Sequence, residues 1–361
     1  MSETRADVLI IGGGFAGAAT AFHLSEALPG SILLVEREEV PGTHASGRNA
    51  GLILQSVANA SIRRALSASQ RYYRAHASEL GFRPSGSLLL GARPQLEALR
   101  ETGRIESSLR SPEEVRQRVP FLEGLPFEQA LETPGDGVMD IWALLQHYLS
   151  GARSRGAKVL LDCEVQSISG SGPFRVETSR GPIEAGYLIN AAGAWAGQVA
   201  AMAGATPLPL VPWKRHLFVL DGVAGIEPHW PFVWNLDPEF YFRPDSVGLL
   251  FSLCDEERAV SPEPTVSAGI SEAAAELILK ELPALRSARE RQVWSCFRTK
   301  APDGEFVIGW DAKLERFLWV AGLGGHGVGS SWEVGRLAAA AFRSRELALE
   351  DAFAPSRFAA C

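Results

Sequence analysis

The sequence predicts an α/β fold, and three segments near the N-terminus support this prediction. Val8–Ile11 is a run of β-branched residues and leucine that ends at glycine, which is typical of a strand buried on both faces of a parallel sheet. Ala16–Leu28 consists mostly of helix-forming residues and is followed by the helix breakers Pro29 and Gly30. Ser31–Val35 is a second buried strand, so the three segments form a β-α-β unit.

The turn between the first strand and the helix has the glycine spacing of a Rossmann-like dinucleotide-binding site. Gly12 permits the tight turn out of the strand, Gly14 lets the backbone approach a pyrophosphate, and Gly17 lets the helix pack close to the sheet. Phe15 and Ala16 begin the helix, whose unpaired N–H groups attract phosphate. The sequence therefore predicts a nucleotide site at this turn.

An acidic residue stands where a ribose contact is expected. Glu36 ends the second strand about 20 residues after the glycines, and a carboxylate there accepts hydrogen bonds from ribose hydroxyls. NAD and FAD both bind such a turn, so this segment alone leaves the cofactor open. The chain then continues from Pro41–Ile53 into a helical stretch through Leu80, unlike the strand and helix alternation of a nicotinamide domain. A polar section, Ala92–Gly124, lies farther along.

Composition limits the possible partners. The chain has 361 residues, enough for two moderate domains, with 46% hydrophobic and 21% charged residues, as in soluble globular proteins. The net charge is -7 and no dense Lys/Arg stretch occurs, which argues against nucleic acid. The sequence also predicts no signal peptide and no transmembrane segment. Cys163, Cys254, Cys296 and Cys361 lack the spacing of zinc sites or redox pairs, so we expect no metal and a cytoplasmic location.

Several later segments carry a family resemblance. They are "SGRNAGLI" after the second strand, "LINAAGAWA" and the C-terminal "GLGGHGVGSS", together with Glu36. With the segment from Asp140 through "LLQHYLSGARSRGAKVLLDCEV", they resemble in order and spacing the D-amino-acid oxidase superfamily of FAD enzymes, in the branch that contains glycine oxidase, sarcosine oxidase and D-arginine dehydrogenase. The resemblance implies a Rossmann-like FAD-binding domain from residues 1–78, 138–212 and 302–361. It also implies a mixed β-sheet substrate-binding domain from the interleaved segments 79–137 and 213–301.

The resemblance also implies a set of FAD-binding residues. These are Gly12, Gly14, Phe15, Ala16, Gly17, Glu36, Arg37, Ser46, Gly47, Arg48, Asn49, Ala50, Gly51, Val165, Ala192, Gly193, Trp195, Gly324, Gly325, His326, Gly327, Val328 and Gly329. The "ASGRNAG" loop offers donors to the pyrophosphate or the isoalloxazine edge, although a solvated loop has the same composition. A helix start near Gly329 would face the flavin C2 carbonyl. Because the C-terminal loop lacks the cysteine that sarcosine oxidases use for attachment, we expect noncovalent FAD.

Three further residues match carboxylate-binding positions of the family. They are Arg298, Arg215 and Tyr241, and arginine suits bidentate recognition of a carboxylate. A surface ion pair or a buried hydroxyl with a satisfied hydrogen bond is the alternative explanation for each of them. His326 occupies an aromatic position of the glycine-rich loop, where a structural role is the alternative to a catalytic one.

Departures from D-arginine dehydrogenase bear on the substrate. Polar positions of that enzyme become Leu52, Leu54 and Val57, and its acidic residue for the guanidinium aligns with Ser87. A buried cation without a carboxylate partner is costly, so we expect a small or apolar side chain.

The resemblance implies FAD-dependent oxidation of an amino acid or N-substituted amino acid. Arg298, helped by Arg215 and Tyr241, would hold the substrate carboxylate while hydride passes from the α-carbon to flavin N5. The imino acid formed would hydrolyse to an oxo acid. Two alternatives stay open: a 2-hydroxy-acid dehydrogenase with His326 as base, and a flavin-binding partner protein without turnover. The substrate, its stereochemistry, the oligomeric state and the electron acceptor, whether dioxygen, a quinone or a protein, also stay open.

Overall fold

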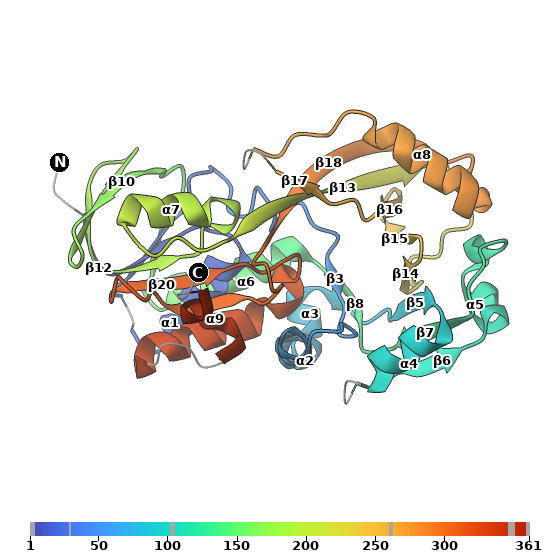
Figure 1. Ribbon diagram of the computed structural model, residues 1–361, viewed down its shortest axis with the longest axis horizontal. Helices are drawn as coiled ribbons and strands as arrows, with labels where there is room; N and C mark the ends of the chain where they lie inside the picture. The colour runs from blue at the N-terminus through green and yellow to red at the C-terminus, as the bar shows by residue number, and fades with distance from the viewer. Residues whose placement is uncertain (1–3, 29, 102–104, 260–262, 346–350, 359–361) are drawn as a thin grey trace.

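The computed structural model describes residues 4–28, 30–101, 105–259, 263–345 and 351–358. Pro29 and Cys361, both used in the sequence predictions, lie outside these residues. Two bodies lie side by side, each built on its own sheet, and the long strands β13 (Val211–Asp221) and β18 (Arg289–Lys300) extend from one toward the other (Figure 1).

The first sheet has a parallel centre. Its strands are β1 (Thr4–Ile11), β2 (Ile32–Val35), β9 (Lys158–Leu160), β10 (Val165–Ser169), β11 (Phe174–Thr178), β12 (Ile183–Asn190), β19 (Val307–Trp310) and β20 (Phe317–Ala321). They run in the order β10-β11-β12-β1-β2-β9, with β20 parallel to the end of β12 and β19 antiparallel to β20. β1 pairs in parallel with both β12 and β2, which confirms the predicted β-α-β unit.

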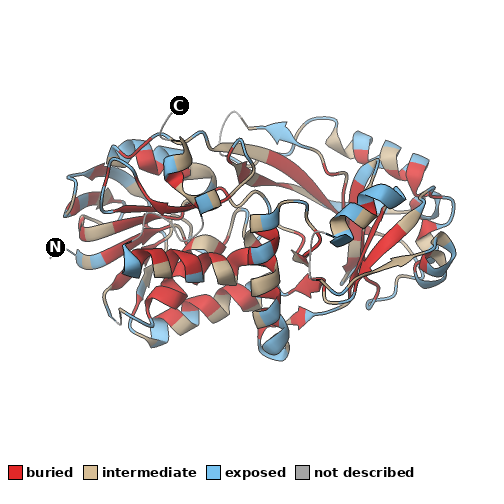
Figure 2. Cartoon of the chain, turned by 60° about the horizontal axis from the view of Figure 1, so that its bottom comes forward, coloured by how far each residue is buried: buried red, intermediate tan, exposed pale blue. Residues whose placement is uncertain are grey.

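Helices cover both faces of this sheet. They are α1 (Phe15–Leu24), α2 (Ala60–Ala75), α3 (Ala77–Leu80), α6 (Ile141–Ser154), α7 (Ala196–Ala203) and α9 (Gly327–Ser344). Because side chains of a strand alternate, Val8 and Ile10 pack with α1, α6 and α9, whereas Leu9 and Ile11 pack on the face covered by α7. Figure 2 shows buried residues along the strands and on the inward sides of the helices.

The second sheet is mainly antiparallel. In addition to β13 and β18 it contains β5 (Ser87–Gly91), β6 (Ser108–Arg110), β7 (Gln129–Thr133), β14 (Phe232–Leu236), β15 (Glu239–Asp245), β16 (Gly248–Ser252) and β17 (Glu257–Arg258). Their order is β17-β13-β16-β15-β14-β5-β7-β6, with β18 also along β13. One face packs on α5 (Pro112–Arg118) and α8 (Ile270–Glu281), and the other carries Leu217, Tyr241 and Cys296 in a separate cluster with Ala50 of the first body.

Short elements complete the chain. They include the helix α4 (Arg93–Glu101) and a three-stranded sheet in the order β3 (Leu52–Ile53), β8 (Gly137–Met139), β4 (Phe82–Arg83). The 3₁₀ turns are η1 (Pro120–Leu122), η2 (Gly193–Trp195), η3 (Pro283–Leu285), η4 (Asp351–Phe353) and η5 (Pro355–Phe358). Within the ranges given above, no helix is both long and apolar enough to cross a bilayer.

The predicted α/β class is confirmed, and two predicted helix boundaries are wrong. Helix α1 ends at Leu24 and not at Leu28, because the Ser25 hydroxyl donates to the Phe22 carbonyl and competes with the helix. The helical stretch before Leu80 is two helices, the first starting only after Asn59, whose side chain accepts from the Ile62 N–H at 2.9 Å. The polar section of residues 92–124 contains α4, β6 and α5.

Candidate active site

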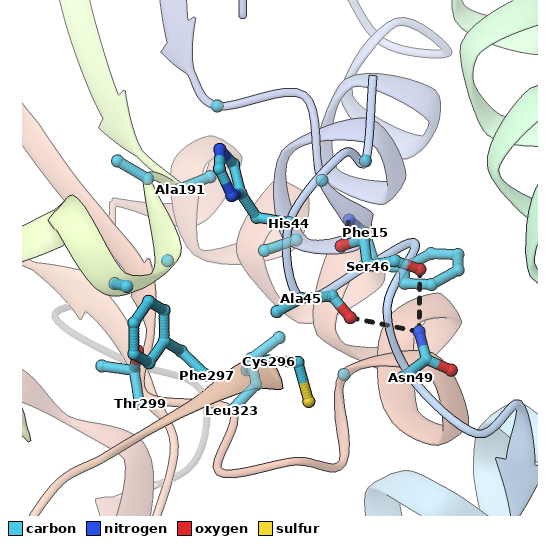
Figure 3. Close-up of a pocket in the computed structure, with 18 of the residues that line it drawn as sticks. Phe15, His44, Ala45, Ser46, Asn49, Ala191, Cys296, Phe297, Thr299 and Leu323 are labelled. Carbon is cyan, nitrogen blue, oxygen red and sulfur yellow. Dashed lines mark hydrogen bonds between the residues drawn. The ribbon is translucent and has the colours of Figure 1, made fainter. Parts of the chain in front are cut away.

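A cavity of about 540 Å³ lies where the parallel strands end and the second sheet begins. Its wall includes the carboxyl ends of β1 (Ile11), β2 (Val35) and β20 (Ala321), with Ala191 directly after β12. Ligands of open α/β sheets bind at this edge. Figure 3 shows Phe15, Ser46 and Asn49 on one side of the cavity and Cys296 and Leu323 on another.

Most of the predicted FAD-binding residues line this cavity. They are Gly12, Gly14, Phe15, Ala16, Glu36, Arg37, Ser46, Asn49, Ala50, Gly51, Val165, Ala192, Gly193, Trp195, Gly324, Gly325, His326, Gly327, Val328 and Gly329. Gly17, Gly47 and Arg48 do not line it. A Cβ at Gly17 would lie 2.0 Å from the Gly12 carbonyl oxygen, so Gly17 instead allows α1 to pack against the turn.

The first turn needs glycine for a conformational reason. Gly12 has φ +112°, and a Cβ there would lie 2.4 Å from the Ala191 carbonyl oxygen. A Cβ at Gly14 would lie 2.7 Å from Ser46 Oγ, which accepts the Phe15 N–H at 2.9 Å. Ser46 therefore satisfies one N–H of the α1 terminus, and other first-turn N–H groups have no partner within the helix.

Glu36 is held rigidly beside this turn. Its carboxylate accepts the Gly13 N–H at 2.7 Å and the Glu38 N–H at 3.0 Å. A carboxylate offers about four lone-pair sites, so Glu36 can also accept ribose hydroxyls.

Arg37, Glu38 and His44 form a polar cluster at the same end of the cavity. The Arg37 guanidinium lies 4.0 Å from the centre of the Trp195 ring, and His44 Nε2 lies 2.8 Å from Glu38 Oε1. Burial alone would raise the pKa of Glu38, but the hydrogen bonds from His44 and Arg37 hold it below its usual range. Sequence reasoning gave His44 no role, and only its spacing to Glu38 in the folded turn reveals this contact.

The "ASGRNAG" loop is shaped by its own side chains and by the second sheet. Asn49 Nδ2 donates to the Ser46 carbonyl at 2.7 Å (Figure 3), and Asn49 Oδ1 accepts the Gly51 N–H at 2.8 Å. Arg243 Nε donates to the Ala50 carbonyl at 2.7 Å, and Trp294 Nε1 donates to the Arg48 carbonyl at 3.0 Å. Sequence reasoning missed both contacts from the second sheet.

The C-terminal glycine-rich loop leads into α9, which begins at Gly327, two residues before the start predicted near Gly329 to Ser331. Gly327, Val328 and Gly329 all line the cavity, so the positive end of α9 points at its contents. The Tyr73 hydroxyl donates to the Val328 carbonyl at 2.9 Å, which fixes the first turn of this helix.

Two of the predicted substrate residues face the cavity together. Arg298 and Tyr241 both line it, and in the described part of the chain the Arg298 guanidinium makes no hydrogen bond or ion pair. Gly325 passes close to the guanidinium, since a Cβ at that position would lie 2.9 Å from Arg298 Nε. Burial raises the pKa of Tyr241 to about 12, although Arg298 and Arg215 oppose the shift, so its hydroxyl is a neutral donor.

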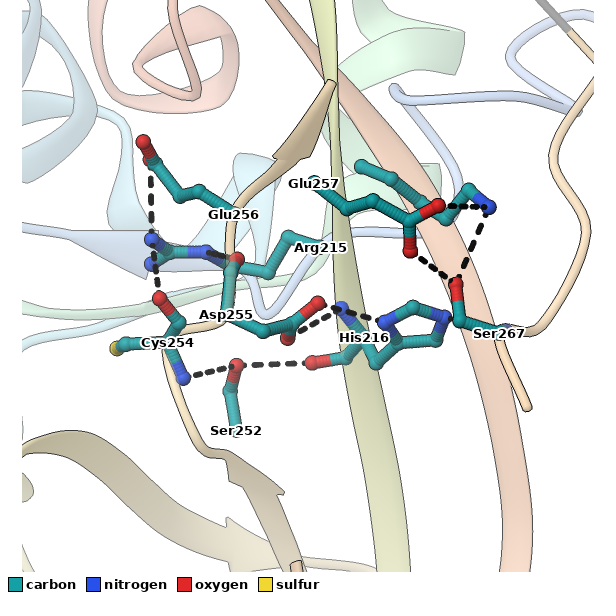
Figure 4. Close-up of polar contacts among 9 residues, drawn as sticks. Arg215, His216, Ser252, Cys254, Asp255, Glu256, Glu257 and Ser267 are labelled. Atoms are coloured by element: carbon teal, nitrogen blue, oxygen red, sulfur yellow. Dashed lines mark hydrogen bonds and ion pairs between the residues drawn. The ribbon is translucent and has the colours of Figure 1, made fainter. Parts of the chain in front are cut away.

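Arg215 has a different place. It does not line the cavity, and its guanidinium donates to the Cys254 and Asp255 carbonyls at 3.0 and 3.1 Å and to Glu256 at 3.1 Å (Figure 4). Its neighbour His216 is fully buried and pairs with Asp255 at 2.7 Å. These contacts fix the segment after β16 against β13.

His326 lines the cavity near Arg298. Burial, with the positive charges of Arg298 and Lys300, lowers the pKa of His326 to about 4. The imidazole is therefore neutral at neutral pH.

Ser87 lies away from the cavity, where its hydroxyl donates to Asp136 at 2.7 Å. Asp136 also accepts the backbone and side-chain N–H groups of Gln55 at 3.1 and 3.0 Å. Burial raises the pKa of Asp136 to about 7 against these hydrogen bonds. This carboxylate is sealed off from the cavity, so it offers no partner to a cationic substrate.

One cavity thus joins a nucleotide-type turn and Glu36 to an arginine and a tyrosine, an arrangement that is typical of dinucleotide-dependent enzymes. A family model described as FAD dependent oxidoreductase (DAO) matches residues 7–341. The chain belongs to this family and is an FAD-dependent oxidoreductase, and the resemblance drawn from its motifs is confirmed.

Known proteins are similar to this chain in sequence and in fold. The mitochondrial dimethylglycine dehydrogenase of Homo sapiens is 29% identical over 268 residues, which cover 69% of this chain and 30% of that protein. The L-proline dehydrogenase of P. horikoshii has a similar structure with a TM-score of 0.87 at 23% identity, covering 99% of both chains. The glycine oxidase of Geobacillus kaustophilus gives a TM-score of 0.83 at 22% identity, covering 98% of this chain and 99% of that one.

Proposed function

We propose that this protein oxidises an amino acid or N-substituted amino acid with a small or apolar side chain to an imino acid, which water converts to an oxo acid. The observation that carries the proposal is Arg298, half-buried and without a protein partner in the described residues, beside Tyr241 in the cavity. An unpaired arginine in a recess is suited to a substrate carboxylate, which it binds through two parallel N–H donors.

The residues present fit FAD. Glu36 would accept the ribose hydroxyls, the start of α1 would face the diphosphate, and the start of α9 would face the flavin carbonyl. Bound FAD would supply the acceptor for the hydride that leaves the substrate α-carbon. We propose noncovalent binding, since residues 322–329, "GLGGHGVG", contain no cysteine. Acid precipitation should release the yellow chromophore into the supernatant.

We propose the following roles for the substrate side. Arg298 binds the carboxylate and the neutral Tyr241 hydroxyl donates a further hydrogen bond to it. Arg215, which contacts the segment 254–256, positions the wall behind them. The two sheets support the proposed domain division. Strands of the first sheet come from 1–78, 138–212 and 302–361, which we assign to FAD, and strands of the second come mainly from 79–137 and 213–301, which we assign to substrate.

The state of His326 favours amine oxidation over oxidation of a hydroxy acid. Removing a hydroxyl proton needs a base whose pKa lies near the working pH. His326, with a pKa of about 4 beside Arg298, is a weak base. A substrate amine that binds uncharged needs no such group.

The test is anaerobic mixing of the yellow holoprotein with D-, L- and N-methyl amino acids and with 2-hydroxy acids. We expect amino acids to bleach the flavin absorbance and Arg298→Met to abolish bleaching at the same concentrations. Bleaching by hydroxy acids alone would show that the protein is a hydroxy-acid dehydrogenase. Bleaching by no compound would favour a flavin-binding protein without turnover.

A further inference from the structure

The substrate side of the cavity has an apolar wall. Trp234 on β14 lies directly across from Tyr241 on β15, with ring centroids 4.8 Å apart. Leu217 of β13 lines the same face of the second sheet, and Leu52 and Leu54 line the cavity from the other body. Trp234 and Leu52 also pack in the apolar cluster that contains Tyr241 and Cys296. The space beside Arg298 and Tyr241 therefore suits hydrocarbon.

The carboxylates of the described cavity wall gather at the opposite end. Glu36 belongs to the nucleotide turn, Glu164 adjoins Val165, and Glu263 lies 3.6 Å from Arg37. A cationic substrate side chain near Trp234 would thus meet no lining carboxylate and would be buried at high cost.

One carboxylate does lie behind the wall. Glu239 accepts the Trp234 Nε1–H at 3.1 Å, yet Glu239 itself does not line the cavity. The face of the cavity at this point is the indole of Trp234. Replacing the indole by a small side chain would open space and remove the group that now separates the cavity from Glu239.

We propose that Trp234 determines the side-chain specificity of the enzyme. Its indole closes the apolar end of the cavity, limits the length of the accepted side chain, and keeps Glu239 from serving substrates that carry a cation. This inference rests on the proposed function, since it takes the substrate carboxylate to be at Arg298.

The test uses straight-chain carboxylates as probes, because their binding requires no turnover. Acetate through octanoate, and 6-aminohexanoate as the cationic analogue, are titrated into oxidised holoprotein while the flavin absorbance is followed. Each buried methylene should tighten binding about fourfold until the chain reaches the indole. In Trp234→Ala the affinity should continue to rise for longer chains. The affinity for 6-aminohexanoate should also rise at least about tenfold relative to that for hexanoate, because the buried ammonium group acquires Glu239 as a carboxylate partner.

Two further variants sharpen the result. Trp234→Phe retains a ring but loses the hydrogen bond to Glu239, so it should accept the same maximum chain length as the wild type. This smaller change also keeps the proposal testable if the alanine variant does not fold. Glu239→Gln in the Trp234→Ala background should reverse the gain for 6-aminohexanoate. Leu236→Ala is the matched control, since Leu236 shares strand β14 and an apolar cluster with Trp234 but does not line the cavity.

The outcomes separate the two proposals. The same chain-length profile in Trp234→Ala and Leu236→Ala would overturn the role of Trp234 and leave the proposed function standing. Carboxylate binding that shifts as described, without bleaching by any amino acid, would support the role of Trp234 in ligand selection and refute the oxidation. Failure of every carboxylate to bind to the wild type would refute both.

Discussion

Replacing Arg298 should weaken carboxylate binding without weakening the fold. Arg298 has no hydrogen-bond or ion-pair partner in the described residues, so its loss leaves no buried carboxylate unpaired. A hydrogen bond to a charged group contributes about 1.5–3 kcal/mol, which corresponds to about 10- to 150-fold in affinity. Arg298→Lys keeps the charge and loses the second donor of the fork, so we expect the Kd for butyrate to rise by about that factor. Arg298→Met loses both donors and should raise it by at least about 100-fold.

The assay is titration of oxidised holoprotein with butyrate, followed by flavin absorbance, alongside thermal unfolding. Arg215→Met is the contrasting variant, because Arg215 is 2% exposed and donates to two carbonyls and to Glu256. It should lower Tm, whereas both Arg298 variants should unfold near the wild-type temperature. An unchanged Kd in Arg298→Met, at normal flavin content, would refute the assignment of the carboxylate to Arg298.

Three further predictions concern the turn, the buried carboxylate and the histidine. Gly12→Ala should lower both Tm and the flavin-to-protein absorbance ratio, because its Cβ would lie 2.4 Å from the Ala191 carbonyl oxygen. Gly181→Ala is the control, since Gly181 has a similar φ of +106° and no atom lies within 4 Å of its added Cβ. This control should lower the free energy of unfolding by only about 1–2 kcal/mol and retain flavin. The pKa of Asp136 is about 7 in the folded protein and 3.8 for an ordinary aspartate, which stands for the unfolded chain. Between these two pH values the folded protein holds a proton that the unfolded chain has lost. The free energy of unfolding should therefore fall as pH rises from about 4 to about 7, by up to about 4 kcal/mol. Asp136→Asn should flatten that slope in urea titrations at several pH values, and an unaltered slope would contradict the raised pKa. His326, with a pKa of about 4, is a weak base, so His326→Gln should reduce the anaerobic flavin-reduction rate less than about tenfold and leave the pH profile of that rate unchanged. A loss of 100-fold or more would identify His326 as a general base.

The β-α-β unit was predictable because its signals are local. The strands Val8–Ile11 and Ile32–Val35 are buried on both faces, so they appear as continuous apolar runs. The end of α1 was predicted wrongly because helix propensity continues past Leu24, whereas the bond from Ser25 to the Phe22 carbonyl depends on one rotamer.

Arg215 and Arg298 could not be told apart from sequence. Both lie on paired strands, opposite Cys296 and Trp213 respectively, and both match family positions. Their difference arises from the segment after β16, where Cys254 adopts φ +56° and turns its carbonyl toward Arg215. That backbone conformation has no glycine or proline signal in the sequence.

The roles of Trp234 and Arg243 were hidden for a related reason. An aromatic residue in a strand usually indicates core packing, and an arginine near a strand end usually indicates solvent. Only the approach of the two bodies places Trp234 at the cavity and brings Arg243 to the Ala50 carbonyl. Contacts between segments so distant in sequence leave no periodic pattern.

The cavity wall combines the turn at Gly12 with the loop and helix start of residues 322–329, close to opposite ends of the 361-residue chain. A folding intermediate in which β20 and the start of α9 are not yet docked has both strands of the nucleotide turn but only part of the cavity wall. Completing the cavity therefore requires residues 322–329 to close on the turn at Gly12, so we expect retention of flavin to report that α9 has docked.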